Sequence, residues 1–212
     1  MNQHNIINNG QGNRIEIDPT ARLEAGHAIV LQGDGHVLKI GPNTAIRAMG
    51  IYISGNGNTL DIGADCDLRG ALHLRQHGSR LHIGAQTTFV GGYLFAMEGR
   101  LLQVGDDCMF SSAVVVRTSD EHPICDSASG ARLNAARDVL IGRHVWLGEG
   151  VTLAKGSAVP EGCVVGARAY VTKPLSRPHA IYAGSPARLV REGVCWRREL
   201  MEDTAETPPR LP

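Results

Sequence analysis

The stretch DVLIGRHVWLGEGVTLAKGSAVPEGCVVGARAYV, residues 138–171, repeats an apolar residue at a fixed interval of six. These anchors are Ile141, Leu147, Leu153, Val159, Val165 and Val171. The fifth position of each hexad is small or β-branched, as in Val145, Val151, Ser157, Cys163 and Ala169. A period of six fits neither a helix, which repeats every 3.6 residues, nor a two-stranded meander. It predicts a chain that runs along a short flat face, turns a corner and repeats, with the anchor pointing inward.

A longer version of the repeat precedes this stretch. VLKIGPNT, TLDIGADC, RLHIGAQT and LLQVGDDC have their anchors at Ile40, Ile62, Ile83 and Val104, with spacings of 22, 21 and 21, and a weaker copy has its anchor at Ile17. Three hexads make one triangular coil of about 18 residues, so the longer spacings indicate one coil plus a small bulge at a corner. The sequence therefore predicts an all-β parallel β-solenoid, in which each coil buries its face by stacking on the next.

Composition narrows the classes of function. The 212 residues carry 21 Lys and Arg against 21 Asp and Glu, so charge gives no argument for a nucleic-acid or anionic-membrane partner. No run approaches about 18 consecutive apolar residues, so we expect no transmembrane segment. The five cysteines form no CxxC pair, and the N-terminal residues do not resemble a signal peptide. We therefore expect a cytoplasmic protein in which Cys66, Cys108 and Cys163 are small buried residues.

The run RTSDEHPICD, which begins at Arg117, interrupts the repeat. Steps of six from Val104 lead to an anchor near residue 122, but the next anchor is Ile141. We therefore expect residues 117–138 to leave the solenoid as a loop, where binding and catalytic groups often lie. His122 in this loop is either a solvated residue or a general base, since an imidazole titrates near neutral pH and can accept and return a proton.

The hexads resemble those of the hexapeptide-repeat acyltransferases over roughly residues 15–190. The resemblance implies a left-handed parallel β-helix, a hand that the spacing does not establish and that runs against the usual rule for parallel crossovers. SDEHPI, followed by VWLG and AGSPAR, is similar to the sugar O-acetyltransferases of this fold, including the galactoside, maltose, polysialic acid and capsule enzymes. Their catalytic histidine matches His122.

Further site residues follow from the same resemblance. Trp146 matches the tryptophan of the VWLG motif and would form a wall of the site, with surface packing between subunits as the alternative. The positions that match the family's contacts to CoA are Gly148, Gly166 and Ala167 along the pantetheine arm, and Thr172, Lys173 and Arg188 at the nucleotide end. Each of these is otherwise an ordinary solvated residue. The run VTKPLSRPHA departs from many relatives, which carry an acidic residue after VTK.

The resemblance implies an acetyl-CoA-dependent O-acetyltransferase acting on a sugar or a capsular or surface polysaccharide. His122 would deprotonate the acceptor hydroxyl for direct attack on the thioester, and the chain has no GxSxG turn for a nucleophilic serine. Backbone N–H groups and the Trp146 indole would stabilise the oxyanion. The group that orients His122 is left open among Asp120, Asp138 and a backbone carbonyl. The family also implies a homotrimer with active sites between subunits, and no metal.

We expect two segments in the chain. Residues 1–183 would form the β-helix acyltransferase domain, and residues 184–212 a C-terminal helix and tail. Ser185 fits the N-cap of a short helix and Pro186 its first position. Residues from 204 onward are expected to fray.

Three alternatives stay open at this point. A serine or other small-metabolite acetyltransferase would share the fold and the co-substrate. A zinc carbonic anhydrase of the same fold would bind its metal through three histidines, and the spacing of His36, His77 and His82 loosely resembles that arrangement. A solenoid that only binds a partner is the third.

Overall fold

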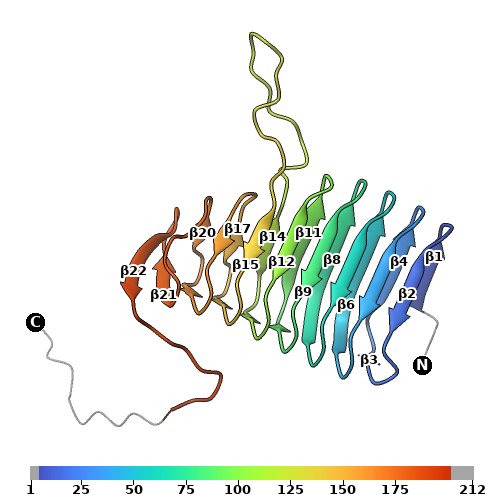
Figure 1. Cartoon of the computed structure of the whole chain (residues 1–212), viewed down its shortest axis with the longest axis horizontal. Helices are drawn as coiled ribbons and strands as arrows, with labels where there is room; N and C mark the ends of the chain where they lie inside the picture. The colour runs from blue at the N-terminus through green and yellow to red at the C-terminus, as the bar shows by residue number, and fades with distance from the viewer. Residues whose placement is uncertain (1–4, 202–212) are drawn as a thin grey trace, which may run out of the picture.

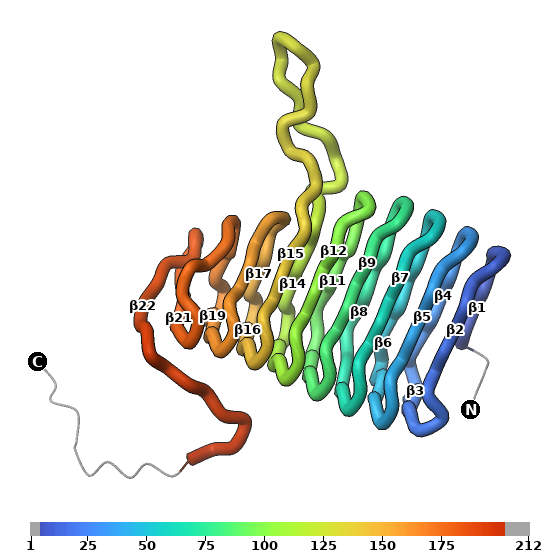
Figure 2. The backbone as a smooth tube through the Cα atoms, viewed as in Figure 1, coloured from blue at the N-terminus to red at the C-terminus, as the bar shows by residue number. Residues whose placement is uncertain are grey.

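The computed structural model describes residues 5–201 and shows a straight stack of coils with one long projection (Figures 1 and 2). These residues form 22 strands and no helix, which confirms the predicted all-β solenoid. Strands of successive coils pair in parallel, and the pairing forms one sheet of seven strands and one of fifteen. Among the described residues there is accordingly no helix long and apolar enough to span a membrane.

The coils have three faces, which we name by what they carry. The seven-strand face contains β2 (Arg14–Ile17), β5 (Val37–Ile40), β7 (Thr59–Ile62), β9 (Arg80–Ile83), β12 (Leu101–Val104), β15 (Val139–Ile141) and β18 (Ala158–Val159). The tryptophan face contains β3 (Arg22–Leu23), the first parts of β6 (Ala45–Ser54) and β8 (Asp67–Arg75), β10 (Thr88–Phe89), β13 (Met109–Phe110), β16 (Trp146–Leu147), β19 (Val164–Val165) and β21 (Ala180–Ala183). The aromatic face contains β1 (Ile6–Asn9), β4 (Ala28–Gln32), the later parts of β6 and β8, β11 (Gly92–Met97), β14 (Val114–Arg117), β17 (Thr152–Leu153) and β20 (Tyr170–Val171).

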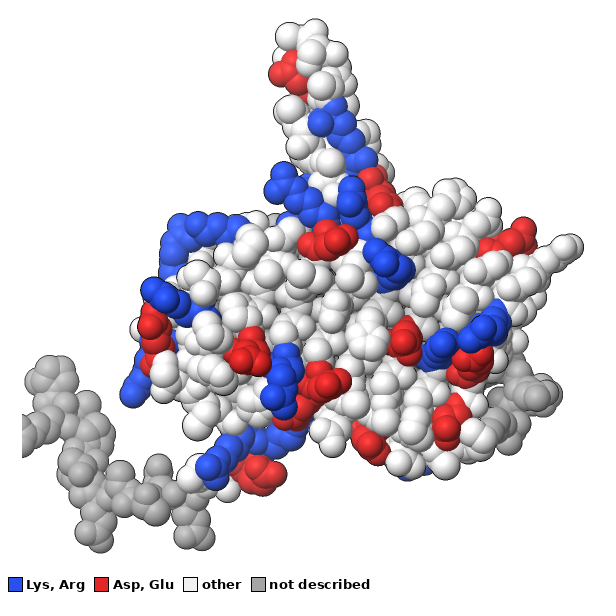
Figure 3. Space-filling model, viewed as in Figure 1, with Lys and Arg blue, Asp and Glu red and all other residues white. Residues whose placement is uncertain are grey.

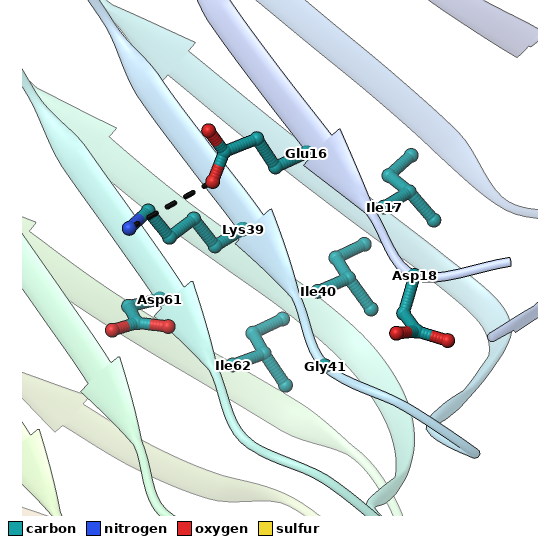
Figure 4. Close-up of a pocket in the computed structure, with 8 residues that line it drawn as sticks. All are labelled: Glu16, Ile17, Asp18, Lys39, Ile40, Gly41, Asp61 and Ile62. Carbon is teal, nitrogen blue, oxygen red and sulfur yellow. Dashed lines mark ion pairs between the residues drawn. The ribbon is translucent and has the colours of Figure 1, made fainter. Parts of the chain in front are cut away.

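The predicted anchors form continuous inward files. On the seven-strand face the file pairs Ile17, Ile40, Ile62, Ile83, Val104, Ile141 and Val159 in register. Figure 4 shows its first three isoleucines side by side, with the charged side chains of Glu16, Lys39 and Asp61 on the other side of the strands. From Ile40 onward these anchors are at most 2% exposed. Each fully buried aliphatic side chain contributes about 1.5–3 kcal/mol, so the files are the main source of stability.

The corner between the aromatic and seven-strand faces is where coil length varies. In the early coils the strands of the seven-strand face have four residues, whereas β18 has two. Most of the extra residues therefore lengthen the strands beside this corner, while β6 carries a bulge of the expected kind, where its register against β8 shifts between Ile46 and Met49. The lengthened corner encloses a column of fully buried polar side chains, in which the Ser79 N–H donates to Asn58 Oδ1 at 2.7 Å and Asn58 Nδ2 donates to Gln76 O at 3.0 Å. These hydrogen bonds to side-chain and backbone groups of neighbouring coils satisfy the buried polar atoms.

The prediction of a C-terminal helix is wrong. Residues Arg188–Glu192 form β22, which pairs antiparallel with β21 at the end of the fifteen-strand sheet. An open sheet edge offers unpaired N–H and C=O groups, and pairing with β22 satisfies those of β21. The chain then turns back along the solenoid, where the Trp196 ring stacks on His144 with centroids 4.1 Å apart. The expected frayed tail lies outside the described residues.

Candidate functional site

The projection, which we call the arm, consists of Thr118–Asp138 and replaces one corner turn between β14 and β15. The Arg137 N–H donates to Thr118 O at 2.9 Å and closes the arm at its base. Further out the two halves run antiparallel, with the Leu133 N–H donating to Ile124 O at 2.7 Å. The arm is therefore a hairpin-like excursion that stands away from the coils, as Figures 1 and 2 show.

Ion pairs tie the foot of the arm to three different coils. Arg75 of β8 donates to Glu121 at 2.7 Å, and Lys155, which follows β17, pairs with Asp120. Glu98, in the turn after β11, accepts hydrogen bonds from Arg132 and from the Ser119 hydroxyl. The Arg132 guanidinium, assisted by Ser119, lowers the pKa of Glu98 to about 2. Such a network restrains a segment that has no apolar core of its own.

Asn134 organises the backbone around His122. Its amide donates to the His122 carbonyl and to Asp120 Oδ2, both at 2.9 Å, and its oxygen accepts from the Ile124 N–H at 2.7 Å. The side chain is buried, with 8% of its surface exposed. The sequence analysis assigned Asn134 no role, and its only signal there was a polar residue twelve positions after His122.

His122 itself is exposed near the foot of the arm. Its backbone N–H donates to the backbone carbonyl of Asp120 at 2.8 Å, while within residues 5–201 neither ring nitrogen makes a hydrogen bond. Of the orienting groups left open, Asp120 is engaged with Lys155 and Asn134. Asp138 accepts from the Leu101 N–H at 2.9 Å instead. The ring is therefore available to a ligand from outside the described chain.

Trp146 lies half-buried on the tryptophan face. Its indole N–H reaches Ser111 Oγ at 3.4 Å, and its ring centroid is 6.1 Å from that of Trp196. The arm leaves from the corner between the other two faces. A single protomer therefore does not bring His122 and Trp146 together.

Three of the predicted CoA-contacting residues occupy stacked turns next to Trp146. Gly148 follows β16, and Gly166 and Ala167 follow β19 one coil later. A Cβ on Gly148 would lie 2.8 Å from the Ala167 nitrogen, so the two turns approach as closely as backbone allows. Among the described residues the exposed Ala167 N–H has no acceptor, and it is free to donate outward.

The other three predicted residues lie at the C-terminal end of the solenoid. Thr172 and Lys173 follow β20, and Arg188 opens β22. All three are exposed, and the Ala187 N–H donates to Tyr170 O at 2.8 Å, which joins β22 to the coil that carries Thr172. The structure thus places the six residues on the last coils, with the glycine turns and Thr172–Lys173 at opposite ends of the aromatic face.

A shallow hollow of about 550 Å³ lies on the aromatic face at the foot of the arm. It is lined by Val115, Arg117, Asp120, Thr152 and Tyr170. The hollow lies between the glycine turns at one corner and the arm at the other. A ligand bound along this end of the solenoid would meet both.

The three histidines of the zinc alternative do not form a metal site. His36 is buried, with Nε2 3.2 Å from Gln32 O and Nδ1 accepting from the Asn58 N–H, while His82 faces Asp61 on the solenoid surface. In the part of the chain that the structure describes, no three His, Cys, Asp or Glu side chains are grouped to hold an ion.

Comparison with known proteins places this architecture. No family model matches the chain. A polysialic acid O-acetyltransferase from Neisseria meningitidis is 34% identical over 211 residues, which cover 100% of this chain and 98% of the relative. A solved polysialic acid O-acetyltransferase superposes with a TM-score of 0.90 at 33% identity over 95% of both chains, and a polysialic-acid-specific acetyltransferase with 0.76 at 28% over 95% and 91%. These matches confirm the predicted left-handed parallel β-helix.

Proposed function

The chain belongs to the polysialic acid O-acetyltransferase family of hexapeptide-repeat enzymes, and from this premise we propose that it transfers an acetyl group from acetyl-CoA to a hydroxyl of a sugar or surface polysaccharide. The observation that carries the proposal is similarity over the full length, arm included, to a relative of that activity. The exposed imidazole of His122 on a restrained arm supplies the base that such a transfer requires.

In the proposed mechanism His122 takes the proton of the acceptor hydroxyl. The hydroxyl oxygen attacks the thioester carbonyl carbon, the carbon–sulfur bond breaks, and the imidazolium returns its proton to the departing thiolate. Backbone N–H groups and the Trp146 indole stabilise the negative charge that develops on the carbonyl oxygen. Asn134 takes no part in the proton transfer. It positions His122, since it fixes the backbone from which the His122 ring projects.

The residues at the C-terminal end suit acetyl-CoA as co-substrate. We propose that the pantetheine group of acetyl-CoA lies along the stacked turns at Gly148 and Gly166, where the Ala167 N–H has no acceptor among the described residues. Lys173 and Arg188 are exposed on the last coils and would bind the nucleotide phosphates, since the ammonium of Lys173 and the guanidinium of Arg188 both pair with phosphate oxygens. No step requires a metal ligand. We also place the enzyme in the cytoplasm, where acetyl-CoA is made and where its free cysteines would stay reduced.

We further propose a homotrimer with each active site between two solenoids. His122 and Trp146 belong to opposite sides of one protomer, so a site that uses both must take them from different copies. The arm supports this arrangement because Ile124 and Leu133 expose 58% and 64% of their surfaces. Apolar side chains on a thin projection gain stability when they lie against a neighbouring subunit.

The test is incubation of the purified protein with acetyl-CoA and a panel of sugar and polysaccharide acceptors. We expect release of CoA together with a mass gain of one acetyl group on one acceptor class, and loss of both with His122→Ala. Acceptor-independent CoA release that is equal in the wild type and in His122→Ala would contradict the proposal. Circular dichroism of the variant establishes that the solenoid is intact.

A further inference from the structure

The aromatic face carries a ridge of rings that the proposed chemistry does not use. Tyr52, His73 and Phe95 lie in register on β6, β8 and β11, with centroids 5.0 and 4.8 Å apart and planes within 18° of parallel. Tyr93 stands in the next file, 5.9 Å from Phe95. We call these four side chains the aromatic ridge.

The ridge is not explained by packing of the core. Tyr52 and Tyr93 expose 41% and 51% of their surfaces, in a chain with only nine Phe, Tyr and Trp residues. Burial, helped by the charge of Arg75, lowers the pKa of His73, which favours the neutral ring in this stack. A row of rings that are exposed at Tyr52 and Tyr93 and half-buried at His73 and Phe95 leaves an apolar patch on the surface, which typically marks a binding site.

The ridge leads to the foot of the arm. The next residue in its file is Arg117, whose guanidinium carbon lies 5.3 Å from the Phe95 centroid and which directly precedes the arm. Arg75 lies 5.6 Å from the same centroid and pairs with Glu121. Within residues 5–201 Arg117 has no carboxylate at ion-pair distance, although Asp120 lines the same hollow and interacts with its charge. Figure 3 shows Lys and Arg at the foot of the arm together with Asp and Glu.

Hydrogen-bonding groups flank the rings at both ends. At the Tyr52 end a hollow of about 390 Å³ contains Gln32, Ser54 and Arg75. At the other end Arg117 lines the hollow at the foot of the arm together with Asp120, which pairs with Lys155. An elongated apolar surface bordered by donors and cations suits a chain of sugar rings, whose C–H faces pack on aromatic rings while their hydroxyls and carboxylates take hydrogen bonds.

We propose that the aromatic ridge is an accessory surface that holds a linear anionic polysaccharide along the solenoid axis, away from the hydroxyl that is acetylated. The inference rests on the proposed function, because it takes the polymer as acceptor. Charge favours this occupant over a second copy of the chain, because Lys155 already pairs with Asp120 and Arg117 therefore adds an excess cation to the hollow. The consequence is a preference for long acceptors, since only a chain that extends past the active site reaches Tyr52.

The experiment compares ridge variants with a matched control on another face. Tyr52→Ala combined with His73→Ala shortens the ridge, and Arg117→Gln removes its free cation. His82→Ala, on the seven-strand face, removes an outward histidine of the same kind. Each change is also made in the His122→Ala background, where binding of long polysialic acid is measured by calorimetry without turnover. The probes for turnover are long polysialic acid and its short oligomers, with acetyl-CoA saturating.

We expect the ridge variants to weaken polymer binding about tenfold and to raise the ratio of KM for long over short acceptors by a similar factor, while His82→Ala changes neither. Unchanged binding and an unchanged KM ratio would overturn the inference even if the wild type acetylates the polymer. A shift of the ridge variants to smaller assemblies in light scattering would also overturn it, since the ridge would then be a contact between copies. If the wild type acetylates no sugar, the proposed function itself has failed. Calorimetry distinguishes this outcome from failure of the ridge proposal, because it measures polymer binding independently of turnover.

Discussion

The solenoid body and the arm are held together by different forces. The body repeats apolar files, so each coil is stabilised by its neighbours and the same side chains recur at the same place. The arm has no buried file. Its foot is held by Glu98, Asp120, Glu121 and their cationic partners, and Asn134 fixes its backbone. The regular part therefore supplies rigidity, and the irregular part carries His122, for which we propose the role of base.

The contrast also explains how so long an insertion is tolerated. Loop-closure entropy grows only logarithmically with length, so a corner turn can become an excursion at modest cost. The corner chosen is the one that is already lengthened in the early coils. Lengthening it does not disturb the parallel register, because Val104 pairs with Ile141 across the insertion as Ile83 pairs with Val104.

The largest effect should come from separating arm and body between two copies. His122→Ala and Trp146→Ala should each lose about 10²–10⁴-fold in kcat. Refolding the two together should restore about one quarter of wild-type activity, because in random trimers one interface in four joins an intact arm to an intact Trp146. The measurement is acetyl transfer before and after mixing. Activity that stays at background, with mixed trimers verified by mass, would place both residues in one protomer's site.

A matched pair of truncations should separate the two regions in stability. Phe110→Ala removes a ring that is 1% exposed in the file of the tryptophan face and should cost about 3–5 kcal/mol. Ile124→Ala on the arm should change the free energy of unfolding of the protomer by under about 0.5 kcal/mol. Denaturant unfolding of dilute protein measures both. Equal losses would mean that the arm folds as part of the body.

Asn134 tests whether the arm positions His122. Asn134→Ala leaves the His122 carbonyl without its donor, and we expect kcat to fall about tenfold with KM for acetyl-CoA unchanged. The melting temperature should move little, since the body is untouched. Asn9→Ala, an exposed asparagine at the end of β1, is the control. A parallel rise in KM would indicate a disturbed co-substrate groove instead of a displaced base.

The smallest effect should be acid loosening of the foot. The folded-state pKa of Glu98 is about 2 against an ordinary value of 4.5, so its stabilisation is complete above about pH 4.5 and is lost as the pH falls toward 2. Digestion with an acid protease should therefore cut the arm increasingly across that window while the coils stay protected. Glu98→Gln should show the cleavable arm already at the upper end of the window. Equal cleavage of wild type and variant throughout would assign the hold to other contacts.

Much of the body could be predicted because its information is local and repeated. A hexad places its anchor inward in every coil, so counting from Ile141 gives the file, and counting from Val104 gives the break that became the arm. The aromatic ridge carried the same signal. Tyr52, His73 and Phe95 are spaced 21 and 22 residues apart like the anchors, but only the register shows that they stack outward.

The remaining features depend on contacts that the sequence does not encode locally. Ser185 and Pro186 fit the start of a helix as well as a turn. The residues that follow form strand β22 because the open edge of β21 offers them hydrogen-bond partners. Asn134 acquires its role only when the hairpin brings it to His122. The sequence by itself determined the solenoid and the presence of His122 and Trp146. Only the tertiary structure decided that they face different ways. The arm leaves the solenoid at the corner between the aromatic and seven-strand faces, whereas Trp146 lies on the tryptophan face, and this placement depends on how each coil folds around the core.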